Sequence, residues 1–123
     1  MKLRSLLFAP GNRPDLIAKL PRSKPDAIAI DLEDAVPSSF KAEARNITRE
    51  AVSALLESKP ACQIFIRVNP VSTSAFRDDI KSLNKNIDGI VIPKVEKLGD
   101  LQTTVRELQQ HDLSYFSVIA GFE

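Results

Sequence analysis

The chain alternates short apolar runs with segments of helical periodicity four times, and a fifth apolar run follows. The apolar runs cover residues 3–10, 26–34, 62–70, 88–95 and 115–123. The segments between them place apolar residues three and four positions apart, which is the spacing of an amphipathic helix. Strands and helices that alternate in this way predict a parallel sheet with right-handed crossovers. We therefore predict an α/β fold over residues 1–123 with no internal domain boundary.

Two architectures have this element order: a doubly wound open sheet and a (β/α)₈ TIM barrel. The glycine-rich fingerprint GxGxxG of a dinucleotide-binding first turn is absent, since Gly11 stands alone in APGNRP. Polar residues follow each apolar run, and in a barrel they would all meet at one mouth. A whole barrel takes about 250 residues, so we expect this chain to cover (β/α)₄ and the fifth strand. The polar residues are Asn12, Arg13, Asp31, Glu33, Asp34, Arg67, Asn69, Lys94, Glu96 and Glu123.

The second apolar run is almost purely Ala and Ile, which predicts a strand buried on both faces. It ends in IDLEDAVP, where Asp31, Glu33 and Asp34 crowd together. Alternation along a strand places Asp31 and Glu33 on one face and Asp34 on the other. From the residues alone this cluster is a metal site, a pair of acid/base groups or a charged strand end.

Composition narrows the classes of function. The chain has 17 basic and 16 acidic residues, so its charge gives no reason to expect nucleic acid as a partner. No apolar run approaches the ~20 residues that a membrane span requires. One cysteine, Cys62, allows no intrachain disulfide and fits a reducing compartment. We expect a cytoplasmic protein that binds neither nucleic acid nor membrane.

Four motifs carry a resemblance to a known family. RSLLFAPGNRPD (4–15), DAIAIDLEDAV (26–36), IFIRVNP (64–70) and DGIVIPKVE (88–96) together resemble the N-terminal half of the citrate lyase β-subunit-like group of the HpcH/HpaI aldolase superfamily. The resemblance implies a (β/α)₈ barrel that assembles as a homotrimer or hexamer and uses Mg²⁺. It also implies cleavage or formation of a C–C bond next to a thioester or carboxylate, with citryl-CoA and malyl-CoA lyases as the nearest kinds of relative.

The resemblance assigns roles to individual residues. Arg67 matches the residue that anchors the substrate carboxylate, a task that suits the planar fork of a guanidinium. Glu123 matches the first metal-binding carboxylate, which also lies beside the substrate. Phe8, Arg13 and Lys19 match positions around the CoA nucleotide and thioester arm. The family's second metal carboxylate and its acid/base Asp have no counterpart in this sequence.

The remaining polar residues are expected to support the site. Because the resemblance gives the metal to strands five and six, Glu33 and Asp34 should hold its surroundings in place, and Lys94 should pair with one of these acids. Glu96 is expected near the start of a helix, where an acid suits the dipole, and His111 at a solvated helix end.

Three functions follow as hypotheses. The first is a Mg²⁺-dependent lyase that cleaves a 3-hydroxyacyl-CoA such as citryl-CoA or malyl-CoA to acetyl-CoA and a 2-oxo acid. The second is a pyruvate-type aldolase of the same superfamily without CoA, against which the PGNRP motif speaks. The third is a truncated, non-catalytic fragment or a binding subunit. For the full-length protein, the resemblance also allows citrate lyase subunits as partners.

Overall fold

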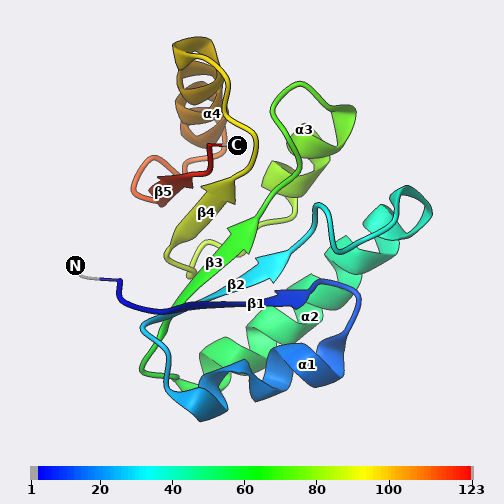
Figure 1. Cartoon of the computed structure of the whole chain (residues 1–123), viewed down its shortest axis with the longest axis vertical. Coiled ribbons are helices and arrows are strands. Elements are labelled where there is room, and N and C mark those ends of the chain that lie inside the picture. The colour runs from blue at the N-terminus through cyan, green and yellow to red at the C-terminus, as the bar shows by residue number, and fades with distance from the viewer. Residues whose placement is uncertain (1–2, 123) are drawn as a thin grey trace.

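A computed structural model describes residues 3–122 of the chain, and in this range five strands alternate with helices (Figure 1). The strands are β1 (Leu6–Pro10), β2 (Ala27–Asp31), β3 (Gln63–Arg67), β4 (Gly89–Ile92) and β5 (Ser117–Ala120). The helices are α1 (Pro14–Lys19), α2 (Lys41–Ser58), α3 (Ser74–Lys81) and α4 (Leu98–Gln110), with short 3-10 turns η1 (Leu20–Ser23) and η2 (Ser38–Phe40).

The strands form one parallel sheet in the order β1-β2-β3-β4-β5, which confirms the predicted α/β architecture. The register pairs Pro10 with Asp31 and Asp31 with Arg67, so the last residues of the first three strands lie in one row. All carboxyl ends therefore lie at the same edge of the sheet, where the polar residues were expected to meet.

The two faces of the sheet are packed differently. One face carries the Ile side chains of β2, β3 and β4 into a large core shared with the helices, which Figure 1 shows beside the sheet. The other face holds a smaller cluster of Ala27, Ala29, Phe65 and Val91. All five residues of β2 are buried, as its composition predicted. No helix of the described part of the chain is long and apolar enough to cross a membrane.

The turn after β1 requires a glycine. Gly11 donates its N–H to the Asp31 carbonyl at 2.8 Å, and its own carbonyl accepts the Thr48 hydroxyl at 3.2 Å. A Cβ at this position would lie 2.8 Å from both the Leu32 and the Thr48 side chains. The glycine of the PGNRP motif therefore serves close packing of the β1 turn against β2 and α2.

Helix α2 begins later than predicted. Ser38 and Ser39 resemble capping residues, so the sequence predicts the start of the helix at one of them, with Phe40 in its apolar stripe. These residues instead form the 3-10 turn η2, and α2 begins at Lys41. The Phe40 N–H bonds to the Pro37 carbonyl, which closes a tighter turn than an α-helix allows, and no serine side chain caps the helix. Phe40, expected in the buried stripe, is 47% exposed because it precedes the helix.

Candidate functional site

The guanidinium of Arg67, at the end of β3, is held by the carboxylate of Asp31, at the end of the neighbouring strand β2. Arg67 Nε lies 2.9 Å from Asp31 Oδ1, and Arg67 Nη2 lies 2.6 Å from Oδ2. The two residues are paired in the sheet register, so the backbone itself brings them together. Asp31 is 2% exposed, whereas the Arg67 side chain is 25% exposed. Arg67 is thus fixed in direction and still reaches the surface.

Electrostatic interactions and a cation–π contact also stabilise the position of the Arg67 guanidinium. Burial acts to raise the pKa of Asp31, but hydrogen bonds from Arg67 and from the N–H groups of Glu33 and Ala35 outweigh it and lower the pKa. The hydrogen bond to Asp31 also raises the pKa of Arg67. The guanidinium carbon lies 4.9 Å from the centre of the Phe8 ring, which attracts a cation through its face. Phe8 is 44% exposed, so it is a platform for Arg67 and not a core residue.

A second ion-pair group joins β4 to the turn after β2. The Glu33 carboxylate is 3% exposed, and its oxygens accept no well-angled hydrogen bond from residues 3–122. Its Oε2 nevertheless lies 2.6 Å from Lys94 Nζ, and Oε1 lies 3.8 Å from Arg67 Nε, so the contacts that hold it are ionic. Lys94 also bonds Asp34 at 3.1 Å. The predicted pairing of Lys94 with acids of the β2 turn is confirmed.

The backbone of Lys94 is unusual for a residue other than glycine. Its φ is 54°, in the left-handed region that residues with a side chain rarely adopt. The close carboxylates of Glu33 and Asp34 raise the pKa of Lys94 well above its ordinary value, so the ammonium stays charged and is not a proton donor near neutral pH. The bond from Lys94 lowers the pKa of Asp34.

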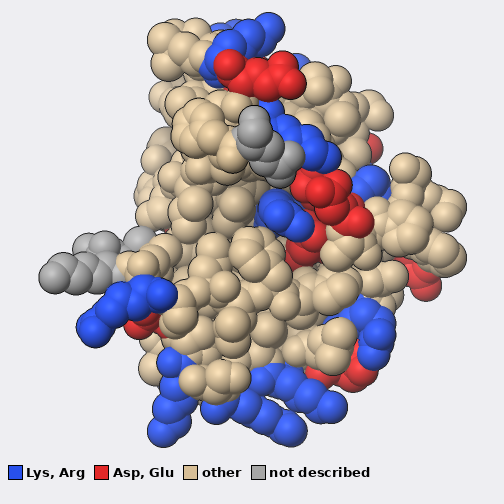
Figure 2. Space-filling model, viewed as in Figure 1, with Lys and Arg blue, Asp and Glu red and all other residues tan. Residues whose placement is uncertain are grey.

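The site brings charges of both signs together, with one more carboxylate than cations. Figure 2 shows acidic and basic side chains adjoining one another over the carboxyl ends of the strands. Two cations and three carboxylates make up the group, namely Arg67, Lys94, Asp31, Glu33 and Asp34. An arginine held among acids at a barrel-type mouth can bind an anionic substrate while its direction stays fixed.

Comparison with known proteins decides the family. Residues 4–115 match the family model described as HpcH/HpaI aldolase/citrate lyase. The chain belongs to this family. The HpcH/HpaI assignment confirms the resemblance read from the four motifs, and with it the TIM-barrel type of fold.

Relatives of the HpcH/HpaI chain include lyases. A citrate lyase subunit beta-like protein of Deinococcus radiodurans is 46% identical over 98% of this chain and 43% of the relative. An L-malyl-CoA/beta-methylmalyl-CoA lyase of Cereibacter sphaeroides is 35% identical over 80% of this chain and 31% of the relative. The chain spans less than half the length of these relatives.

Solved structures that are similar to the chain include citrate lyase β-type proteins. CitE of Mycobacterium tuberculosis in complex with magnesium and acetoacetate matches 98% of this chain and 46% of that chain, with a TM-score of 0.70 and 27% identity. The same protein with magnesium, acetoacetate and coenzyme A matches 94% of this chain and 38% of that chain, with a TM-score of 0.68 and 27% identity.

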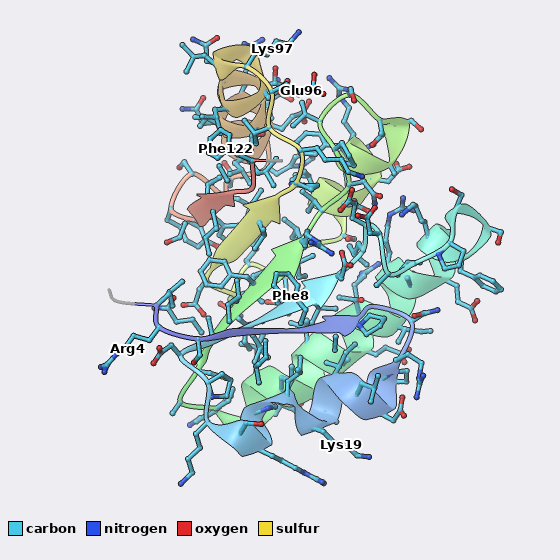
Figure 3. The ribbon with its side chains drawn as sticks, in the orientation of Figure 1. Arg4, Phe8, Lys19, Glu96, Lys97 and Phe122 are labelled. Atoms are coloured by element: carbon cyan, nitrogen blue, oxygen red, sulfur yellow. The ribbon has the colours of Figure 1, made fainter. Side chains whose placement is uncertain are left out.

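The residues that the family resemblance assigned to CoA do not all lie together. The Phe8 ring lies against the Arg67 guanidinium. Arg13 precedes α1, is largely exposed and bonds Asp15 at 3.0 Å. Lys19 lies near the end of α1, on the other side of β1 from Phe8 (Figure 3). The structure therefore joins Phe8 to the Arg67 group and leaves Arg13 and Lys19 outside it.

The acids of the β2 turn do not form a metal site. Among residues 3–122, no three His, Cys, Asp or Glu side chains lie close enough to hold a metal ion. Glu123, the predicted metal ligand of the HpcH/HpaI chain, lies outside the described residues. Glu96 precedes α4, and His111 ends α4 at 3.9 Å from Glu107, so both lie near helix ends as expected.

Sequence reasoning missed a buried polar network behind the site. Asp79 of α3 is completely buried, and it accepts hydrogen bonds from the Asn69 N–H at 2.8 Å, the Asn69 amide at 2.7 Å and Arg45 Nε at 2.8 Å. The Asn69 amide also donates to the Leu32 carbonyl at 3.0 Å. The network ties the β2 and β3 turns to two helices. A signal was available, because Asp79 stands between Phe76 and Ile80 on the apolar stripe of its helix.

Proposed function

We propose that this chain is part of a magnesium-dependent carbon–carbon lyase that acts on a 3-hydroxyacyl-CoA such as citryl-CoA or malyl-CoA. The reaction would yield acetyl-CoA and a 2-oxo acid. The observation that carries the proposal is the fixed guanidinium of Arg67 at the carboxyl end of the sheet, held by Asp31 and open to the surface. Membership of a family that contains citrate lyase β-like and malyl-CoA lyase relatives supports it.

Arg67 has donors to spare for a substrate. Its bonds to Asp31 use the edge formed by Nε and Nη2. A guanidinium carries five N–H donors, so the edge formed by Nη1 and Nη2 stays available for a carboxylate. We propose that the substrate carboxylate binds this second edge while Asp31 keeps the first.

The described residues do not fit a magnesium site by themselves. Glu33 is the buried carboxylate best placed to take a cation, but the Lys94 ammonium already lies 2.6 Å from it. Mg²⁺ usually takes only one or two carboxylates, with water and substrate in the other positions. We propose that Glu123 is one of them and that a second comes from outside this sequence. When bound, magnesium would supply positive charge to the enolate oxygen.

The remaining assignments are proposals of the same kind. We propose that residues 1–123 are the N-terminal half of a (β/α)₈ barrel without an internal boundary, in a cytoplasmic homotrimer or hexamer. We propose that the CoA moiety contacts Phe8, Arg13 and Lys19. The residues that bind substrate and metal are proposed to be kept in position by Glu33, Asp34 and Lys94. The bonds from Arg13 to Asp15 use Nε and Nη2, so the edge formed by Nη1 and Nη2 stays available for a phosphate.

The test is magnesium-dependent release of acetyl-CoA from citryl-CoA and malyl-CoA by the full-length protein that contains residues 1–123, and by its Arg67→Lys variant. A lysine ammonium cannot form paired, parallel hydrogen bonds to the Asp31 carboxylate and to a substrate carboxylate, as a guanidinium can. The kcat/KM of Arg67→Lys should therefore fall about a hundredfold. Arg49→Lys, on the exposed side of α2, serves as the matched control and should behave as the wild type.

Two outcomes would overturn the proposal. The lyase assignment fails if the full-length protein turns over neither thioester, or if Arg67→Lys is as active as the wild type. Release of pyruvate from a 4-hydroxy-2-oxo acid, with no activity on either thioester, would favour a CoA-independent aldolase of the same superfamily.

A further inference from the structure

The turn that carries Glu33 is held from two sides by opposite charges. On one side, the Asp31 carboxylate accepts the N–H groups of Glu33 at 2.8 Å and Ala35 at 3.0 Å. On the other side, the ammonium of Lys41 donates to the carbonyl oxygens of Leu32, Glu33 and Val36. An anion binds the amides of the turn and a cation binds its carbonyls.

The three carbonyls form a cage around Lys41, which we call the carbonyl cage. Lys41 Nζ lies 3.0 Å from Leu32 O, 2.9 Å from Glu33 O and 3.2 Å from Val36 O. An ammonium group has three N–H donors and no acceptor, so the cage uses its full hydrogen-bonding capacity. Carbonyl oxygens arranged in this way replace the water around a cation, as they do in ion-binding sites of proteins.

Lys41 occupies a helix position that is unfavourable for a cation. Lys41 is the first residue of α2, where the positive end of the helix dipole disfavours a cation. A lysine on an exposed first turn would turn its ammonium into water. This side chain is half-buried and turns back over residues that precede it by five to nine positions. The carbonyl cage therefore offsets an unfavourable helix position.

We propose that Lys41 is a positioning residue that acts as the internal cation of the Asp31–Val36 turn and holds Glu33 in place between Lys94 and Arg67. Within residues 3–122 the carboxylate of Glu33 has ion pairs with Lys94 and Arg67 but no well-angled hydrogen bond, so its position depends on these cations and on the backbone that carries it. Without the ammonium, Val36 O loses its donor, while Leu32 O keeps Asn69 and Glu33 O keeps the Val36 N–H. The turn should then loosen at its Val36 end, and the Val36 N–H bond to Glu33 O passes this loss on to Glu33.

The structural part of this proposal does not depend on the proposed function, and NMR spectroscopy tests it directly. In the full chain labelled with ¹⁵N and ¹³C, one lysine ammonium should exchange slowly with water and show couplings across hydrogen bonds to the carbonyl carbons of Leu32, Glu33 and Val36. The signal should vanish in Lys41→Ala and remain in Lys81→Ala, which removes an exposed lysine at the end of α3. Fast exchange of every lysine ammonium would overturn the carbonyl cage.

Chemical rescue distinguishes a cation from simple packing. Lys41→Ala removes three methylene groups and the ammonium, the atoms that propylammonium contains. Propylammonium should therefore raise the melting temperature of Lys41→Ala, and tetramethylammonium at the same concentration should not, because it has the charge but no N–H donor. Lys81→Ala should respond equally to both salts. Equal responses of Lys41→Ala would mean that Lys41 contributes only packing.

The positioning role is tested in the lyase assay, and this arm rests on the proposed function. Lys41→Ala should lower kcat/KM about tenfold, as is typical when a residue that orients a ligand is lost, and propylammonium should restore it. Loss of activity without rescue, together with an intact NMR signature in the wild type, would leave the carbonyl cage standing and overturn its link to the site. No turnover by the wild type would overturn the lyase proposal alone.

Discussion

The carboxylate of Asp31 is shared between a side chain and the main chain. It binds Arg67 across the sheet and the N–H groups of Glu33 and Ala35 in its own turn. One buried charge therefore sets both the direction of the guanidinium and the shape of the turn. The pKa of Asp31 is lowered because these hydrogen bonds outweigh the effect of burial, which would raise it.

Asp31→Asn should reduce the free energy of unfolding by about 3 kcal/mol near neutral pH, because it leaves Arg67 and the turn without their anion. A carboxylate whose pKa is lowered in the folded state stabilises the fold above the unfolded-state value of about 4. That contribution disappears as the pH falls through the lowered pKa. Urea unfolding should therefore show that the difference in the free energy of unfolding between the wild type and Asp31→Asn becomes smaller in acid.

The matched control is Asp15→Asn, which breaks the exposed pair with Arg13. Exposed pairs contribute little, so this variant should follow the wild type at each pH. An Asp31→Asn variant that is as stable as the wild type near neutral pH would contradict the role given to Asp31.

At this scale the sequence predicted part of the site. The pairing of Lys94 with the acids of the β2 turn was predicted correctly, because both follow strands whose ends meet. The bond between Asp31 and Arg67 was not predicted, since it depends on a register that places residues 36 positions apart side by side. Lys41 was not singled out either, because its first-turn position resembles that of any solvated helical lysine.

Strand β4 meets β5 through a glycine. Gly89 is paired with Ser117, and a Cβ at Gly89 would lie 1.9 Å from the Ser117 carbonyl oxygen. Backbone atoms cannot move aside as a flexible side chain can. The close approach of these two strands therefore depends on the absence of a side chain.

Gly89→Ala should lower the free energy of unfolding by about 3 kcal/mol, because β5 must shift away from β4. Thermal unfolding and hydrogen exchange at Val118 would measure the loss. Gly99→Ala is the matched control, since the nearest atom to its Cβ is 3.9 Å away in the first turn of α4. It should raise stability by about 0.5 kcal/mol. Equal effects of the two substitutions would contradict this account of Gly89.

The order and type of the elements were predictable, and the details of their ends were not. The apolar runs predicted all five strands in their places, but each strand is shorter than its run. The start of α2 was missed since Ser38 and Ser39 look like capping residues. Their turn is closed instead by the Phe40 N–H and the Pro37 carbonyl.

The sheet has two edges and carries apolar side chains that the described residues leave exposed. Phe122 is 72% exposed and Leu98 is 68% exposed. Unpaired strand edges and exposed apolar groups favour association with another surface. The exposed residues lie on β1, on α4 and around β5, and they are Leu7, Phe8, Leu98, Val105, Val118 and Phe122.

The chain of residues 1–123 by itself should therefore self-associate as its concentration rises. Sedimentation velocity should show a shift to larger species, and Val105→Lys on α4 should reduce it. Ser53→Lys adds the same charge to an exposed position on α2 and should leave association unchanged. A monomer at every concentration would contradict the prediction.

The strand order has a consequence for the way the chain folds. Every strand pairs with the one that precedes it, so no strand has to wait for a distant segment before it can be added. Pairing between sequence neighbours keeps the loss of chain entropy small at each step, which favours fast assembly. A polypeptide emerging from the ribosome could add β2 to β1, then β3, β4 and β5, in the order of synthesis. The carboxyl ends that carry Asp31, Arg67 and Lys94 would then come together progressively during translation.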